Sequence, residues 1–160
     1  MKEEIKNAIQ GFEFGAPFGV FGRLEKALKE NETPLFIFEE VSKMSSIVVA
    51  ITSERILVVT PSLFSPSSVT QLPYEKISKV VFYRRSFYNT LEIEYPGGKI
   101  VAAGREEWIK RAAKTLYAKA KELSLEHIEF IQMDTRPTAF KGGSFKDFFK
   151  NLFRIPSTRE

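Results

Sequence analysis

The chain has 160 residues, of which 43% are hydrophobic, and it carries a net charge of +4 with no cysteine. This length suits one domain with appendages. No apolar run approaches the roughly 20 residues of a membrane-spanning helix, and the charged start lacks the apolar centre of a signal peptide. We therefore expect a cytoplasmic protein. Without cysteine, disulfides, thiolate metal sites and cysteine nucleophiles are excluded.

The positive charge is mild, and its excess lies in the C-terminal third of the chain. A dedicated nucleic-acid binder carries a dense basic stripe, which this chain lacks. Nucleic acid is therefore not an expected partner, whereas a moderately anionic surface is compatible with the charge.

Two helical patterns are expected in residues 1–34. Their apolar residues recur at spacings of three and four: Ile5, Ala8 and Ile9 in the first pattern, and Phe21, Leu24 and Leu28 in the second. Such spacing places apolar side chains on one face of a helix. Between the patterns lies a segment rich in glycine and phenylalanine, "GFEFGAPFGVFG". It lacks the Lys and Ser or Thr of a phosphate-binding loop, so its glycines are expected to allow bends.

The region 35–103 is rich in short apolar or β-branched runs separated by turn formers. The runs are "LFIFEEV", "SIVVAIT", "RILVVT", "VTQL", "ISKVVFY", "TLEIEY" and "KIVAA". In "TLEIEY" apolar and acidic residues alternate, which indicates a strand with one buried face and one solvated face. Seven short strands in this span predict an antiparallel barrel or sandwich.

One long helix is predicted over 104–126, where Ile109, Ala112, Leu116, Ala120 and Leu123 form an apolar stripe. After it, "HIEFIQM" is a candidate extra strand, and a loop leads to "GGSFKDFFKNLFRIP". These patterns divide the chain into an N-terminal helical and aromatic segment (1–34), a central domain (35–126) and a C-terminal extension (127–160).

Three stretches resemble the bacterial pleckstrin-homology-like (PH-like), GRAM-related domains. They are "AITSERILVV" (50–59), "QLPYEKISKVVF" (71–82) and "LEIEYPGGKI" (91–100), in the family's order and followed by its helix. The resemblance covers about 35–123. It implies an α+β fold, a barrel or sandwich of about seven antiparallel strands capped by the long helix, here with flanking helical segments at both ends.

The resemblance also implies a binding scaffold rather than an enzyme. Some PH domains bind phosphoinositides through several basic residues in the loop between their first two strands. Here that loop, "EVSKMSS", holds one lysine, Lys43. Several phosphate charges need several cations, so the resemblance does not extend to a phosphoinositide pocket.

Basic residues near aromatic ones are the best local candidates for contact with an anionic ligand or partner. "FYRRSFY" (82–88) sets Arg84 and Arg85 among aromatic residues, a combination that can stack on rings and bind phosphates. The more ordinary interpretation is a strand end with solvated arginines. Lys43, Lys99 and Arg105 complete the candidate set.

No catalytic group, metal site or cofactor is expected. The only histidine is His127, and the only aspartates are Asp134 and Asp147. A nucleophile motif is absent near His127, and metal sites need clusters of ligands. The predicted function is therefore a non-enzymatic binding or scaffold module.

Nine of the phenylalanines lie outside the PH-like region, and their apolar side chains need another surface to pack against. The candidate interface residues are Phe12, Phe14, Phe18, Phe21, Phe145, Phe148, Phe149, Leu152 and Phe153. The last five follow the i, i+3, i+4, i+7, i+8 pattern of an amphipathic helix too short to be stable alone.

Three candidates remain for what packs against the apolar face of this predicted helix: the N-terminal segment of the same chain, another subunit, or lipid. Self-association or a protein partner is the first functional expectation. The alternative is a peripheral protein at the inner face of the membrane, bound to anionic lipid through the Phe-rich helix and basic residues.

Overall fold

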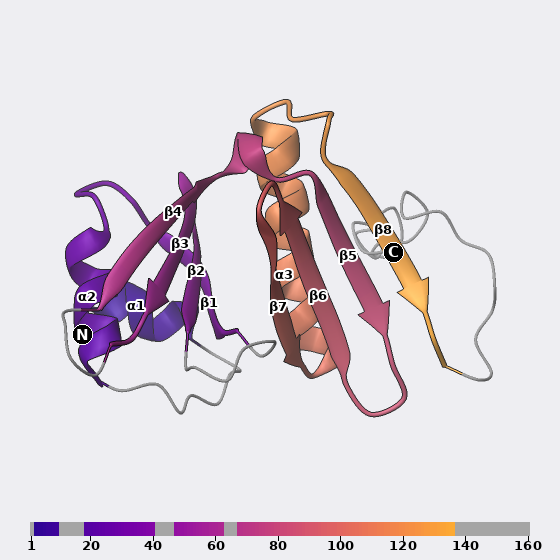
Figure 1. Cartoon of the computed structure of the whole chain (residues 1–160), viewed down its shortest axis with the longest axis horizontal. Coiled ribbons are helices and arrows are strands. Elements are labelled where there is room, and N and C mark those ends of the chain that lie inside the picture. The colour runs from indigo at the N-terminus through magenta and orange to yellow at the C-terminus, as the bar shows by residue number, and fades with distance from the viewer. Residues whose placement is uncertain (1, 10–17, 41–46, 63–66, 137–160) are drawn as a thin grey trace, which may run out of the picture.

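A computed structural model of the chain describes residues 2–9, 18–40, 47–62 and 67–136 (Figure 1). In chain order the elements are α1 (Glu3–Ala8), α2 (Phe18–Ala27), β1 (Pro34–Glu39), β2 (Val48–Thr52), β3 (Arg55–Thr60), β4 (Ser68–Pro73), the 3-10 helix η1 (Tyr74–Lys76), β5 (Lys79–Arg84), β6 (Asn89–Tyr95), β7 (Gly98–Gly104), α3 (Glu106–Glu122) and β8 (Glu129–Asp134). The seven strands expected between 35 and 103 are present as β1 to β7, and the candidate extra strand is β8. The predicted α+β architecture is confirmed.

The first sheet, sheet A, has the antiparallel order β1-β2-β3-β4 and is covered on both faces. Its inner face contributes to the main core. Its outer face packs against α1 and α2, which lie beside it in Figure 1. Ile5 and Leu24 from these helices are fully buried with Leu57 of β3. Because both faces are covered, all five residues of β2 are buried.

The second sheet, sheet B, has the order β7-β6-β5-β8. β5, β6 and β7 form an antiparallel meander, and Gly97 takes a φ of 104° in the β6–β7 turn. β8 pairs in parallel with β5, from Lys79 opposite Glu129 to Arg84 opposite Asp134. Parallel neighbours need a long crossover, which α3 supplies.

The helix α3 packs onto the main core between the two sheets through its predicted stripe. Ile109, Ala112 and Leu116 are buried there with residues of both sheets. Leu123 differs from its expected place on the stripe, because it is the C-cap residue and is 42% exposed. Ser124 then takes a φ of 55°, the left-handed conformation that commonly ends a helix.

A buried carboxylate joins the two sheets where β1 approaches β7. Oε1 of Glu40, just after β1, accepts a hydrogen bond from the backbone N–H of Val101 in β7 at 3.0 Å. β7 is the last strand of sheet B, so this N–H belongs to an edge that would otherwise be open to another chain. The contact links the sheets and protects that edge.

No helix among the described residues is long and apolar enough to cross a bilayer.

Candidate functional site

Strand register brings the two central arginines of the candidate set to one end of sheet B. Arg84, at the end of β5, lies opposite Asn89 of β6, and Asn89 lies opposite Gly104 of β7. The β5–β6 connection and the first turn of α3 therefore share this end, which is the lower end of sheet B in Figure 1. Arg105 is the N-cap residue of α3 and lies there too.

The charge of Arg84 is met by the first turn of α3. Its Nη2 donates to Oε1 of Glu106 at 2.5 Å, and Nζ of Lys110 lies 2.8 Å from the same oxygen. The hydrogen bond from Lys110 lowers the pKa of Glu106, burial opposes this shift, and the charge of Arg84 adds to the lowering. Nε of Arg84 is buried and has no partner among the described residues. Arg84 thus anchors α3 to the sheet.

Arg85 differs from Arg84, because none of the described acidic side chains forms an ion pair with it. Its guanidinium lies over the ring of Tyr83, 5.0 Å from the ring centroid, and its Nε is 3.5 Å from the hydroxyl of Thr90. Its backbone N–H donates to Oδ1 of Asn89 at 3.2 Å, which shapes the turn. Stacking therefore orients the cation without neutralising it.

Two aromatic side chains project from the same hairpin into solvent. Phe87 is 97% exposed and Tyr88 is 52% exposed. Residues Arg84, Arg85, Phe87 and Tyr88 are called the basic-aromatic tip below. A nearly fully exposed phenylalanine two residues from an arginine that has no acidic partner in the described part of the chain offers both an apolar contact and a positive charge.

The surroundings of the basic-aromatic tip are mixed in sign, with a positive excess. The charged residues at this end are Arg84, Arg85, Arg105, Lys110 and Arg136 against Glu106, Glu107 and Asp134. Arg105 lies 5.1 Å from the ring centroid of Trp108. The guanidinium of Arg136 donates two hydrogen bonds to Asp134, at 2.9 and 2.6 Å, and its backbone N–H donates a third at 3.1 Å; these bonds lower the pKa of that carboxyl.

The other predicted contact residues do not share this end. Lys99 lies opposite Glu94, at the other end of β6 and β7, and its Nζ is 3.2 Å from Oε1 of Glu92. Lys43 lies outside the described residues. The candidate interface residues outside the described side chains are Phe12, Phe14, Phe18, Phe145, Phe148, Phe149, Leu152 and Phe153. Phe21 is partly buried against the outer face of sheet A.

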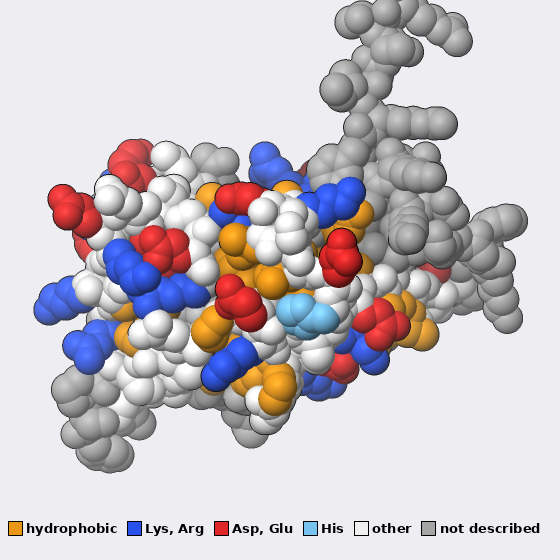
Figure 2. Space-filling view, turned by 90° about the horizontal axis from the view of Figure 1, so that it is seen from above, with side chains coloured by type: hydrophobic (Ala, Val, Ile, Leu, Met, Phe, Trp, Pro, Cys, Tyr) orange, Lys and Arg blue, Asp and Glu red, His pale blue; other side chains and the backbone are white. Residues whose placement is uncertain are grey.

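Among the described residues, no three His, Cys, Asp or Glu side chains gather as metal ligands would. Nε2 of His127 lies 2.8 Å from the carbonyl oxygen of Glu75, so this nitrogen carries a proton and donates. Figure 2 shows the face that carries the histidine, where acidic and basic side chains are interspersed. The contact ties the turn after α3 to η1.

Two of the three motifs that carry the PH-like resemblance, 50–59 and 71–82, meet around one buried carboxylate, that of Glu32, whose side chain is 0% exposed. Arg55 donates to it from Nε at 2.9 Å and from Nη2 at 2.8 Å. The hydroxyl of Thr52 donates to it at 2.7 Å, and the hydroxyl of Tyr74 donates to the carbonyl of Thr52. Arg55 also donates to the carbonyl of Ala27 at 3.0 Å, which links β3 to the end of α2.

This network predicts a loss of stability in acid. Burial raises the pKa of Glu32, but hydrogen bonds from Arg55, Thr52 and the Lys29 amide outweigh burial and lower it below the usual value of 4.5. A carboxyl with a lowered folded pKa stabilises the fold above its unfolded pKa, and this contribution is lost as pH falls through the folded pKa. We expect the free energy of unfolding to decrease as the pH drops below about 4.5.

The measurement is urea unfolding at a series of pH values for the wild type and Glu32→Gln. The variant should be less stable at neutral pH and should lose less stability in acid. Glu54→Gln, which alters an exposed ion pair with Lys29, is the control and should keep the wild-type profile. Identical acid profiles for wild type and Glu32→Gln would contradict the assignment.

Comparisons with known proteins agree with this architecture. The model of the family described as "Bacterial PH domain" matches residues 28–122. The hSac2 domain of the human phosphoinositide phosphatase Sac2 is similar, with 10% identity over 78% of this chain and 91% of that chain and a TM-score of 0.50.

Two bacterial structures are similar at lower TM-scores. A pleckstrin-homology domain of Shewanella amazonensis has 17% identity over 72% of this chain and 98% of its own (TM-score 0.43). A pleckstrin-homology-domain protein of Shewanella loihica has 14% identity over 62% and 91% (TM-score 0.42). No curated protein matches the chain. Because the family model matches more than half of this chain, the chain belongs to the bacterial PH domain family.

Proposed function

We propose that the chain is a non-enzymatic binding module that attaches peripherally to an anionic membrane surface through the basic-aromatic tip. The observation that carries this proposal is the 97% exposure of Phe87 next to Arg85, a cation without an acidic partner among the described residues. An aromatic side chain enters the boundary between headgroups and acyl chains, while a neighbouring arginine stays at the headgroups.

The expected affinity is modest. Burying one phenylalanine contributes about 1.5–3 kcal/mol, and a basic residue near an anionic leaflet contributes about 1 kcal/mol. Tyr88, half-exposed beside Phe87, adds a ring whose hydroxyl can remain in water. These contributions support weak and reversible attachment, for which the predicted amphipathic helix at 145–153 is a proposed second contact.

The test is co-sedimentation of the full chain with phosphatidylserine-containing vesicles and with phosphatidylcholine vesicles. Wild type should bind the anionic vesicles, and salt should weaken this binding because exposed charges are screened. Phe87→Ser should reduce the vesicle affinity about tenfold or more. Arg85→Glu should reduce it most at low salt.

Matched controls lie at the opposite end of α3 and of sheet B. Leu123→Ser changes another exposed apolar side chain, and Lys76→Glu reverses an exposed charge in η1. Both should bind like wild type. If Phe87→Ser binds vesicles as wild type does, the tip is not the membrane contact.

Self-association or a protein partner is the other class that the sequence leaves open. Light scattering without vesicles separates it from the membrane proposal. If wild type forms a dimer that Phe87→Ser dissociates, and neither binds vesicles, the exposed ring serves a second copy of the chain and the membrane proposal is wrong.

A further inference from the structure

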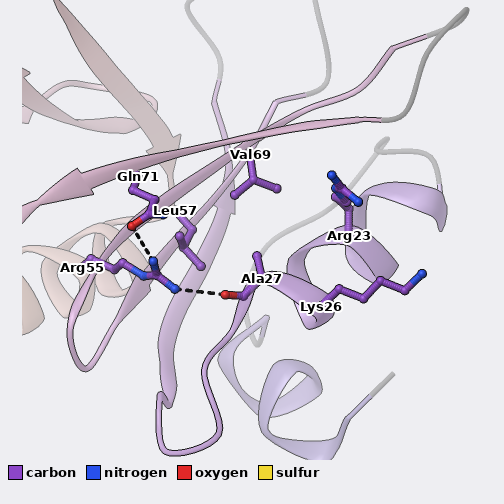
Figure 3. A pocket seen from close by; sticks show the side chains of 7 residues that line it. All are labelled: Arg23, Lys26, Ala27, Arg55, Leu57, Val69 and Gln71. Atoms are coloured by element: carbon purple, nitrogen blue, oxygen red, sulfur yellow. Dashed lines mark hydrogen bonds between the residues drawn. The ribbon is translucent and has the colours of Figure 1, made fainter.

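A groove separate from the basic-aromatic tip lies between α2 and the β3–β4 edge of sheet A. Its volume is about 290 Å³, and Figure 3 shows its lining from three elements. The described lining residues are Arg23, Lys26, Ala27, Arg55, Leu57, Val69 and Gln71. Three of them are cations and none is acidic, while Ala27, Leu57 and Val69 make its apolar wall.

The polar groups of the groove present donors. Arg55 has five N–H groups, of which four donate to Glu32, Ala27 and Gln71. The remaining N–H is on Nη1. Because Oε1 of Gln71 accepts from Nη1, the amide nitrogen of Gln71 keeps two N–H groups for a ligand.

The donor side of the groove is held in place before any ligand arrives. The bidentate pair with Glu32 and the bond to the Ala27 carbonyl fix the guanidinium of Arg55 between β3 and α2. Glu32 offsets the charge of Arg55, so the net charge comes from Arg23 and Lys26. None of the described acidic side chains forms an ion pair with either, and in Figure 3 Lys26 extends away from the strands.

We infer that this groove binds a small amphipathic anion, with its carboxylate or phosphate near Arg23 and its apolar part against the partly exposed side chains of Ala27 and Val69. A groove with cations, free donors and an apolar wall, but no acceptor side chain left unengaged, selects against cations and against fully polar anions. The volume suits a ligand of about a dozen heavy atoms. The inference does not depend on the tip, which belongs to the other sheet.

The test is calorimetric titration of the full chain with four probes: octanoate, phenyl phosphate, inorganic phosphate and uncharged octanol. Octanoate or phenyl phosphate should bind, and whichever binds more tightly identifies the anionic group. Octanol and inorganic phosphate should bind at least tenfold more weakly. If inorganic phosphate binds as tightly as phenyl phosphate, the attraction is only surface charge and the inference is wrong.

Variants at exposed positions assign the binding to the groove. Arg23→Gln with Lys26→Gln removes two exposed cations without touching the Glu32 network, and should weaken anion binding about tenfold. Lys29→Gln, three residues after Lys26 but outside the lining, should leave affinity unchanged. Equal affinities for wild type and the double variant, or no binding of either amphipathic anion, would overturn the inference.

Discussion

Replacing Arg55 with leucine is expected to lower the free energy of unfolding by about 3–5 kcal/mol, because it leaves the Glu32 carboxylate buried without its charge partner. The side chains of Arg55 and Glu32 are 11% and 0% exposed, so water cannot replace the lost contacts. The variant also loses the link to the Ala27 carbonyl at the end of α2. Chemical denaturation at neutral pH measures the change.

An exposed ion pair near this network is the matched control. Lys29 and Glu54 form an ion pair, but their side chains are 59% and 40% exposed. Removing an exposed pair changes stability by less than about 1 kcal/mol, so Lys29→Ala should remain close to wild type. A loss in Arg55→Leu no larger than that in Lys29→Ala would show that the network is dispensable.

Replacing Leu24 with alanine is expected to lower the free energy of unfolding by about 2–5 kcal/mol. Leu24 is fully buried between α2 and the outer face of sheet A, where it shares a cluster with Ile5 and Leu57. The truncation removes buried apolar surface and leaves a cavity. Thermal and urea unfolding should show one cooperative transition at lower stability.

Gly22→Ala in the same helix is the control for α2. Gly22 is exposed, and no heavy atom lies within 4 Å of the position that a Cβ would take. This substitution should raise stability by roughly 0.4–1 kcal/mol, since alanine restricts the unfolded chain and favours a helix. If Leu24→Ala leaves stability unchanged, α1 and α2 do not stabilise the domain.

The sequence identified the tip region but not the difference between its arginines. Arg84 and Arg85 are neighbours in the same motif, and their spacing says nothing of Glu106, which lies on another element. Phenylalanine is a residue type that is commonly buried, so the sequence alone suggests a place in the core for Phe87. Only the end of β5–β6 pairing at Arg84 and Asn89 puts it beyond the sheet and in solvent.

The sequence of β2 indicates that sheet A is covered on both faces. "SIVVAIT" is apolar without alternation, which is typical of a strand buried on both faces. It shows that a second layer is needed but does not say which segment supplies it. The described part of the N-terminal region supplies α1 and α2, whereas the predicted helix at 145–153 lies outside the described residues.

By itself, the sequence determined the number and order of the strands of the PH-like region and the capping helix. These features depend on alternation, turn residues and helical spacing, which act between near neighbours along the chain. The tertiary structure decided the parallel pairing of β8, the burial of Glu32 beneath Arg55 and the solvent exposure of Phe87. Each of these depends on residues brought together from distant parts of the chain, and local patterns carry no information on such contacts.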